Sequence, residues 1–163
     1  MNTTNLIEKS VTMETTAIFS KDESKRYLLK MSWDKTKPHA CIIMTYPSTA
    51  NEYIIDQTTM LVRNNAVKQG YGSISIVNLF CGLDLKKPET DRMNSSVLAQ
   101  ECSDADLVIV AYGRGIAHTE EKESLLSALK TFKDKLYTIV DSSGQAFSHP
   151  LSPKAREWKI EKI

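Results

Sequence analysis

The sequence predicts an α/β fold of three layers, with a central, mostly parallel four-stranded sheet that an N-terminal antiparallel β-hairpin extends. Residues 39–153 alternate short apolar runs with helical patterns, and this alternation gives right-handed crossovers and a parallel sheet. The run Cys41–Met44 is apolar throughout and stops at turn residues, which is typical of a strand buried on both faces. Two strand-like segments precede this run with no helix between them, as in a hairpin.

Length and composition indicate one domain over residues 1–163, since this length supports a sizeable core. The 21 basic and 20 acidic side chains leave a net charge of +1. A protein that grips long duplex DNA needs more positive charge, whereas a small nucleotide or a short strand is compatible with this balance. The chain has neither an 18-residue apolar run nor a signal-peptide pattern, so we expect no membrane association and a cytoplasmic location. Cys41, Cys81 and Cys102 lie far apart and are expected to be reduced thiols.

The N-terminal third carries the predicted hairpin. Residues 1–14 are polar, and we expect them to be frayed or to lie along an edge. Residues 15–34 form the hairpin, with strand-like segments over 15–20 and 25–34 and a polar turn over 21–24. Alternation in the second strand makes one of its faces more apolar than the other.

The core elements from residue 39 onward are predicted in the following order: strand 40–46, helix 57–69, strand 73–79, helix 94–102, strand 106–112, a helix from Thr119, and strand 136–140. Asp56 is the expected N-cap of the first helix, and Gly70 closes that helix. Thr119 is the expected cap of the third helix, whose apolar stripe is Leu125, Leu126, Leu129 and Phe132. The tail over 154–163 is expected to add a short turn or strand.

The loop after the first core strand is the first candidate site, because open α/β sheets bind ligands past the carboxyl ends of their strands. The candidate ligand-binding residues here are Tyr46, Pro47, Ser48, Thr49 and Asn51. The alternative is a tight turn that uses proline and serine for backbone reasons. Asp56 could orient a water or accept a sugar hydroxyl, or it could be only a helix cap worth about 1 kcal/mol.

The second core strand carries an amide inside an apolar run. Asn78 could recognise a nucleobase edge, or it could hold a neighbouring loop, because an unsatisfied buried polar group costs about 1–3 kcal/mol. Phe80 beside it could stack on a planar ligand or belong to the core.

Two later loops add candidates. Tyr112, Gly113 and Arg114 follow the third strand, where glycine lets the backbone approach a ligand and arginine could meet a phosphate or a carboxylate; a solvated arginine is the alternative. His149 follows the fourth strand and could donate to an oxyanion or take a proton near neutral pH, or it could merely be exposed. His39 and His118 precede their elements and are less well placed.

Known cofactor and catalytic motifs are absent: the sequence has no Walker loop, GxGxxG, HExxH or GxSxG pattern. No spacing of His, Cys and carboxylates indicates a zinc or iron site, so no metal and no cofactor are predicted. Carboxylates crowd the helix starts, so any phosphate is expected to contact Arg114, Lys154 or Arg156. The predicted ligand is therefore recognised mainly by its base or sugar.

Seven short motifs occur in order between about residues 15 and 158: Arg26–Leu28 with Trp33, Pro47–Ala50, Asp56-x-Thr58, Gly70–Gly72, Val77–Phe80, Ala111–Gly113 and His149–Leu151. Together they resemble the uncharacterised bacterial and phage DUF family 1643. Members usually have Asn and Asp at the positions of Tyr46 and Asn51, Trp at Tyr112 and Pro at Gln57. The change at Asn51 removes a carboxylate that could have activated water. That family has no settled activity, so its name alone does not supply a function.

A looser resemblance concerns the order of the loops, which is similar to the layout of uracil-DNA glycosylases. It implies that Pro47 and Ser48 position a water, that Asn78 recognises the base and that His149 stabilises the departing base. Similarity at the level of the fold does not establish function.

Two functions of different classes are therefore predicted. The first is an enzyme that hydrolyses the N-glycosidic bond of a nucleoside, a nucleotide or a flipped base, with Asp56 or a loop carbonyl holding water and His149 stabilising negative charge. The second is a protein that binds or sequesters a nucleotide-like molecule, for example a signalling nucleotide, without turnover. Tyr46, Asn51 and the balanced net charge favour binding without turnover, whereas the loop that contains His149 favours hydrolysis. A protein–protein adaptor is a third alternative. Recognition of a nucleoside or nucleotide is common to the first two, and no oligomeric state is predicted.

Overall fold

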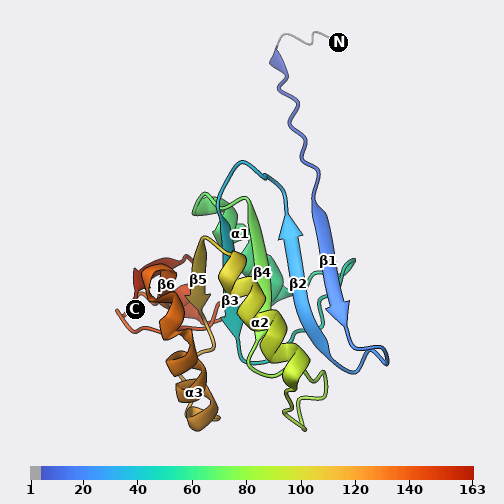
Figure 1. Ribbon diagram of the computed structural model, residues 1–163. Helices are drawn as coiled ribbons and strands as arrows, with labels where there is room; N and C mark the ends of the chain where they lie inside the picture. Colours follow the sequence, from blue (N-terminus) through green and yellow to red (C-terminus); the bar gives the residue numbers. More distant parts are fainter. Residues whose placement is uncertain (1–4) are drawn as a thin grey trace.

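The computed structural model describes residues 5–163, which form a mixed α/β domain around one seven-stranded sheet (Figure 1). The strands are β1 (Glu14–Phe19), β2 (Arg26–Ser32), β3 (His39–Met44), β4 (Ser73–Asn78), β5 (Leu107–Val110), β6 (Leu136–Val140) and β7 (Lys159–Lys162). The helices are α1 (Gln57–Lys68), α2 (Arg92–Asp104) and α3 (Thr119–Leu129), with short 3-10 segments at Lys130–Lys135 and Pro153–Ala155.

The strand order across the sheet is β1-β2-β4-β3-β5-β6-β7. The four central strands, β4, β3, β5 and β6, are parallel to one another. The hairpin β1–β2 extends this group at one edge through antiparallel pairing of β2 with β4. The mixed α/β class is therefore as predicted, and the sheet agrees with the prediction in part, in its parallel centre and its N-terminal hairpin. The expected sheet had six strands, and the tail, for which a turn or a strand was expected, supplies a seventh, β7, which pairs antiparallel with β6 at the other edge.

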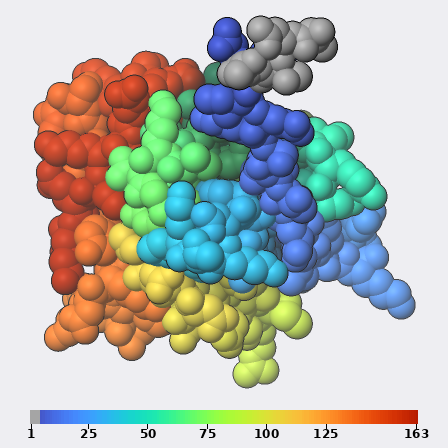
Figure 2. All heavy atoms as spheres, turned by 90° about the horizontal axis from the view of Figure 1, so that it is seen from above, coloured from blue at the N-terminus to red at the C-terminus, as the bar shows by residue number. Residues whose placement is uncertain are grey.

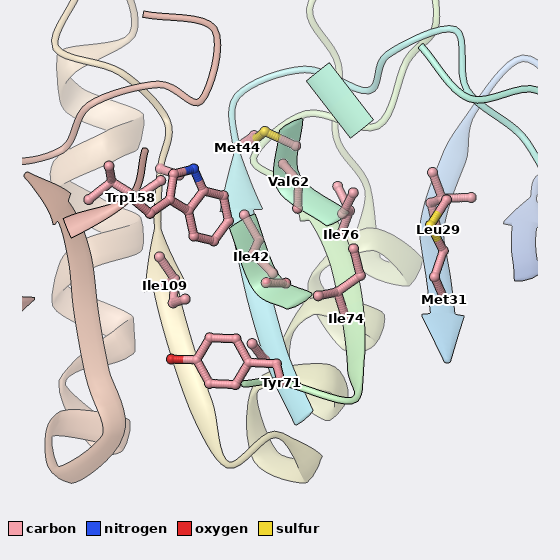
Figure 3. Close-up of a cluster of buried hydrophobic side chains, with 14 of the residues drawn as sticks. Leu29, Met31, Ile42, Met44, Val62, Tyr71, Ile74, Ile76, Ile109 and Trp158 are labelled. Atoms are coloured by element: carbon pink, nitrogen blue, oxygen red, sulfur yellow. The ribbon is translucent and has the colours of Figure 1, made fainter. Parts of the chain in front are cut away.

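Helices cover both faces of the sheet, so the fold has three layers (Figure 1). One core contains Ile42 and Ile109 from the sheet, Val62 from α1, and Trp158 from the C-terminal segment (Figure 3). The other core joins the opposite face to α2 and α3. Alternate residues of β3 enter alternate cores, which confirms the prediction of a strand buried on both faces.

The caps at the helix starts agree with the sequence-based prediction only in part. Asp56 caps α1, as predicted, by accepting the Thr59 N–H at 2.8 Å. The second helix begins earlier than expected, because the Asp91 side chain accepts the Asn94 N–H at 2.9 Å and so provides a cap. Thr119 is not a cap: His118 holds the N-cap position, and the Thr119 hydroxyl donates to the Ile116 carbonyl.

The strands β1 and β7 form the opposite edges of the sheet, so the blue N-terminal hairpin and the red C-terminal segment lie on opposite sides in Figure 2. Residues 6–13 contain no helix or strand and run as an arm from β1 (Figure 1). Of the other residues expected to be frayed, Glu14 already belongs to β1, and residues 1–4 lie outside the described residues. Cys41, Cys81 and Cys102 are buried free thiols, in agreement with the prediction. Within residues 5–163, no helix is both long and apolar enough to cross a membrane.

Candidate functional site

The carboxyl ends of the four parallel strands meet at one edge of the sheet, where two hollows flank the loop between β3 and α1. The larger, the hairpin-side pocket, measures about 620 Å³. Its lining includes predicted site residues together with side chains from the β1–β2 hairpin and from the loop after β4: Pro47, Ser48, Thr49, Asn51 and Asp56 with Phe19, Glu23, Leu83 and Leu85. The smaller, the α3-side pocket, measures about 280 Å³, and its lining includes Thr45, Tyr46, Tyr112, Gly115, Ala117, His118, Lys122 and His149. The predicted site residues are thus divided between two pockets.

Arg26, the first residue of β2, holds the β3–α1 loop in place from beneath. Its side chain is 1 % exposed. The guanidinium donates to the Ala50 carbonyl at 2.7 Å, to the Ser48 carbonyl at 3.2 Å and, more weakly, to Asn78 Oδ1 at 3.4 Å. Burial lowers the pKa of Arg26 to about 10, although the charge of Asp56 partly counteracts this. The loop is therefore fixed by a buried cation, and sequence analysis had assigned Arg26 no role beyond its motif.

Asp56 lines the hairpin-side pocket while it caps α1. Burial raises the pKa of this carboxyl, but the Thr59 N–H, the Ser48 and Thr59 hydroxyls and Arg26 together outweigh burial and hold the pKa below its ordinary value of 3.8. The predicted cap is therefore confirmed, and its carboxylate also lines the pocket; its predicted contact with a water or a sugar hydroxyl stays a prediction. A carboxylate with a lowered pKa is a good acceptor of hydrogen bonds and a weak general base.

The other loop side chains differ in how much hydrogen-bonding capacity they leave for a ligand. Asn51 Oδ1 accepts the N–H groups of Tyr53 and Ile54, at 2.9 and 2.7 Å, which closes a local turn. Thr49 is exposed at the pocket wall. The alternative of a tight turn therefore explains the oxygen of Asn51, which binds backbone N–H groups. The Thr49 hydroxyl is exposed to solvent and is available to a ligand.

Asn78 and Phe80 line neither of these two pockets. The Asn78 amide donates to the Tyr46 carbonyl at 2.7 Å, and its oxygen faces Arg26. This geometry favours the alternative in which Asn78 holds a neighbouring loop. Phe80 is buried, stacks on Tyr46 with ring centroids 5.6 Å apart and meets the His118 ring edge-on, so it supports the floor of the α3-side pocket.

His149 enters the α3-side pocket beside Gly113, where a Cβ on the glycine would lie 3.5 Å from the His149 Cβ. Burial lowers the pKa of His149, so the ring is neutral at pH 7. Its Nδ1 accepts the Leu151 N–H at 3.1 Å, and a neutral imidazole with Nδ1 as acceptor carries its proton on Nε2. The ring therefore has one N–H donor that its Nδ1 contact leaves unused.

Tyr46 and His118 contact each other in the same pocket. The Tyr46 hydroxyl lies 2.5 Å from His118 Nε2, and the His118 Nδ1 is 4.0 Å from Glu121. Sequence analysis had considered His118 less well placed, because it precedes a helix. The chain places it in the pocket because the residue takes a left-handed conformation, with φ 58°, at the start of α3.

Lys122, which sequence analysis missed, is the cation of the α3-side pocket. Its side chain is 8 % exposed and its Nζ contacts the carbonyls of Gly115 at 3.0 Å and Gly113 at 3.5 Å. The same Nζ lies 5.3 Å from the centre of the Tyr112 ring, and burial lowers the pKa of Lys122. Lys122 follows His118 by four residues, which on a helix places both side chains on one face; this spacing was the available signal.

Arg114 is exposed, lies outside both pockets and donates to Asp141 at 2.8 Å. The predicted partner, a carboxylate, is therefore supplied by the protein itself. The hydroxyl of Ser143, the N–H groups of Gln145 and Ser143, and Arg114 together lower the pKa of Asp141 to about 2.

The comparisons with known proteins add a family. The family described as "Protein of unknown function (DUF1643)" matches residues 26–151. No curated protein matches the chain. In the described part of the chain, no group of three or more His, Cys, Asp or Glu side chains is arranged to hold a metal ion.

Proposed function

The chain belongs to the DUF1643 family, and we propose that it recognises a nucleoside or nucleotide-like small molecule at the carboxyl edge of its sheet. The single observation that carries this proposal is the pair of unlike pockets on either side of the β3–α1 loop. A nucleotide also has two unlike parts, a neutral base with its sugar and an anionic phosphate.

The chemistry of the hairpin-side pocket suits a base and a sugar. Phe19, Leu83 and Leu85 supply apolar surface for a planar ring, while Ser48, Thr49 and Asp56 supply polar groups. Carboxylates accept hydrogen bonds from ribose hydroxyls in nucleotide-binding folds. The volume of about 620 Å³ falls within the range of about 300–1,000 Å³ that is usual for small-molecule sites.

Binding without turnover is the form of this proposal that the geometry favours. The two predicted catalytic residues, Asp56 and His149, line different pockets. Asp56 is also committed to capping α1, and its lowered pKa makes it a weak base.

A second candidate is hydrolysis of an N-glycosidic bond, as the resemblance to uracil-DNA glycosylases implies. The observation in its favour is the fixed tautomer of His149, whose Nε2–H could donate to the negative charge that develops on a departing base.

Incubation with a panel of nucleosides and nucleotides, followed by mass spectrometry and thermal melting, tests both candidates. A binding protein returns every compound unchanged and melts at a higher temperature with its ligand. Free base that appears with the native chain and vanishes in His149→Ala would establish hydrolysis instead. If no compound is altered and none shifts the melting temperature, the proposal is wrong.

A further inference from the structure

The α3-side pocket contains a buried positive charge without a negative partner. Lys122 is more than nine-tenths buried, and within residues 5–163 its polar contacts are two backbone carbonyls. An ammonium group has three N–H donors, and one of the two carbonyl contacts is long, at 3.5 Å. A buried charge is costly unless it is paired, so the pocket is complementary to an anion.

The remaining donors of the pocket also suit an anion. The neutral His149 ring carries its proton on Nε2, since its Nδ1 accepts the Leu151 N–H. The Tyr46 oxygen lies 2.5 Å from His118 Nε2. In the His118 tautomer whose Nε2–H donates to this oxygen, the tyrosine O–H is left to donate to an anion. The carboxylate of Glu121 lies 4.0 Å from His118 Nδ1, and its side chain is half exposed. Its exposure to solvent screens its charge more strongly than that of the buried lysine.

The size of the pocket limits what it can hold. Its volume of about 280 Å³ is below the usual range of about 300–1,000 Å³ for a drug-sized ligand. It therefore suits one group of a larger ligand, while the hairpin-side pocket across the same loop suits the remainder. The sequence-based expectation placed any phosphate on Arg114, Lys154 or Arg156. None of these lines the α3-side pocket, and Arg114 already pairs with Asp141.

We propose that Lys122, His149 and Tyr46 form an oxyanion subsite that receives the phosphate of a nucleoside monophosphate. This inference rests on the proposed function and narrows it: the preferred ligand is the nucleotide and not its nucleoside. Lys122 supplies the charge, and His149 and Tyr46 supply directed hydrogen-bond donors.

Calorimetric titration of matched pairs tests the subsite, with adenosine, guanosine, cytidine and uridine each compared with its 5′-monophosphate. The native chain is expected to bind at least one monophosphate about tenfold or more tighter than the parent nucleoside. Lys122→Met should remove this preference and leave the nucleoside affinity unchanged, whereas Lys122→Arg should retain most of it.

Lys135→Met is the matched control. Lys135 also donates to two carbonyls, those of Ser103 and Ala105, and lies over an aromatic ring, Phe132, but it borders neither pocket. This variant should keep the full preference for the monophosphate.

The outcomes separate the two proposals. Equal affinity of the native chain for nucleoside and monophosphate overturns the subsite and leaves nucleoside recognition intact. The subsite is also overturned if the Lys122→Met variant, shown by its thermal melt to be folded, still binds the monophosphate more tightly than the nucleoside. Absence of binding by every pair overturns the proposed function and the subsite together.

Discussion

Arg26 is the residue on which the shape of the β3–α1 loop depends. Two loop carbonyls and the Asn78 amide accept its guanidinium protons inside the protein. Arg26→Met should lower the free energy of unfolding by about 3 kcal/mol, because each buried acceptor left unsatisfied costs about 1–3 kcal/mol. Urea unfolding measures this loss. Arg156→Met, at an exposed arginine, is the control and should change stability by less than about 0.5 kcal/mol; equal effects of the two variants would refute this role of Arg26.

Asp141 makes the stability of the fold depend on pH in the acid range. Its pKa is lowered to about 2, first by the Ser143 hydroxyl and also by Arg114. A carboxyl with a lowered folded-state pKa binds protons more weakly in the folded than in the unfolded chain, so its stabilisation is present above about pH 4 and is lost as the pH falls toward 2. Urea midpoints of the native chain and Asp141→Asn should therefore differ at pH 6 and converge near pH 2. A difference that stays constant over this range would contradict the assignment.

The helix α1 begins just after a residue, Asp56, that both caps the helix and lines the hairpin-side pocket. Asp56→Ala removes the acceptor of the Thr59 N–H and should cost about 1 kcal/mol. Asp56→Asn keeps an acceptor at this position and should cost less, although it removes the charge near Arg26. Urea unfolding of the two variants separates the cap from the charge. A larger loss in Asp56→Asn than in Asp56→Ala would show that capping is not the main contribution.

The C-terminal segment that contains β7 is also a part of the core. Trp158 is 5 % exposed, and its indole N–H is buried without a partner. Trp158→Ala should cost about 3–5 kcal/mol. Trp158→Phe should cost less, because it keeps a ring and removes an unsatisfied donor. If Trp158→Ala has the same urea midpoint of unfolding as the native chain, this segment does not contribute to the core.

Periodicity predicted the elements that local sequence determines. The apolar run of β3 and the caps and glycine around α1 are local signals, and these elements lie where they were expected. The strand β7, with only Ile160 partly buried, alternates too little to be distinguished from a tail. The early start of α2 depended on Asp91, a cap that the expected boundary overlooked.

The site was harder to predict, because it depends on contacts between distant segments. Arg26 is 22 and 24 residues from the carbonyls it holds, and only the pairing of β2 beside β4 brings them together. The split between two pockets arises where Tyr46 turns toward His118 while Ser48 faces Arg26. No pattern in the loop itself specifies these opposite directions.

At the scale of the whole molecule, the parallel centre of the sheet gathers the functional candidates at one edge. Loops after β3, β5 and β6 reach the α3-side pocket, and the hairpin turn and the loop after β4 complete the hairpin-side pocket. A further apolar groove of about 700 Å³ lies between α2 and α3. We therefore propose ligand recognition at the strand ends and none in the groove.

Amide chemical-shift mapping of the isotope-labelled chain during titration with nucleoside 5′-monophosphates tests this placement most directly. We expect the shifts to concentrate in residues 45–56, 112–122 and 147–152, with little change along the exposed face of α2. Shifts centred on the groove between α2 and α3, or a spectrum unchanged by every nucleotide, would contradict it.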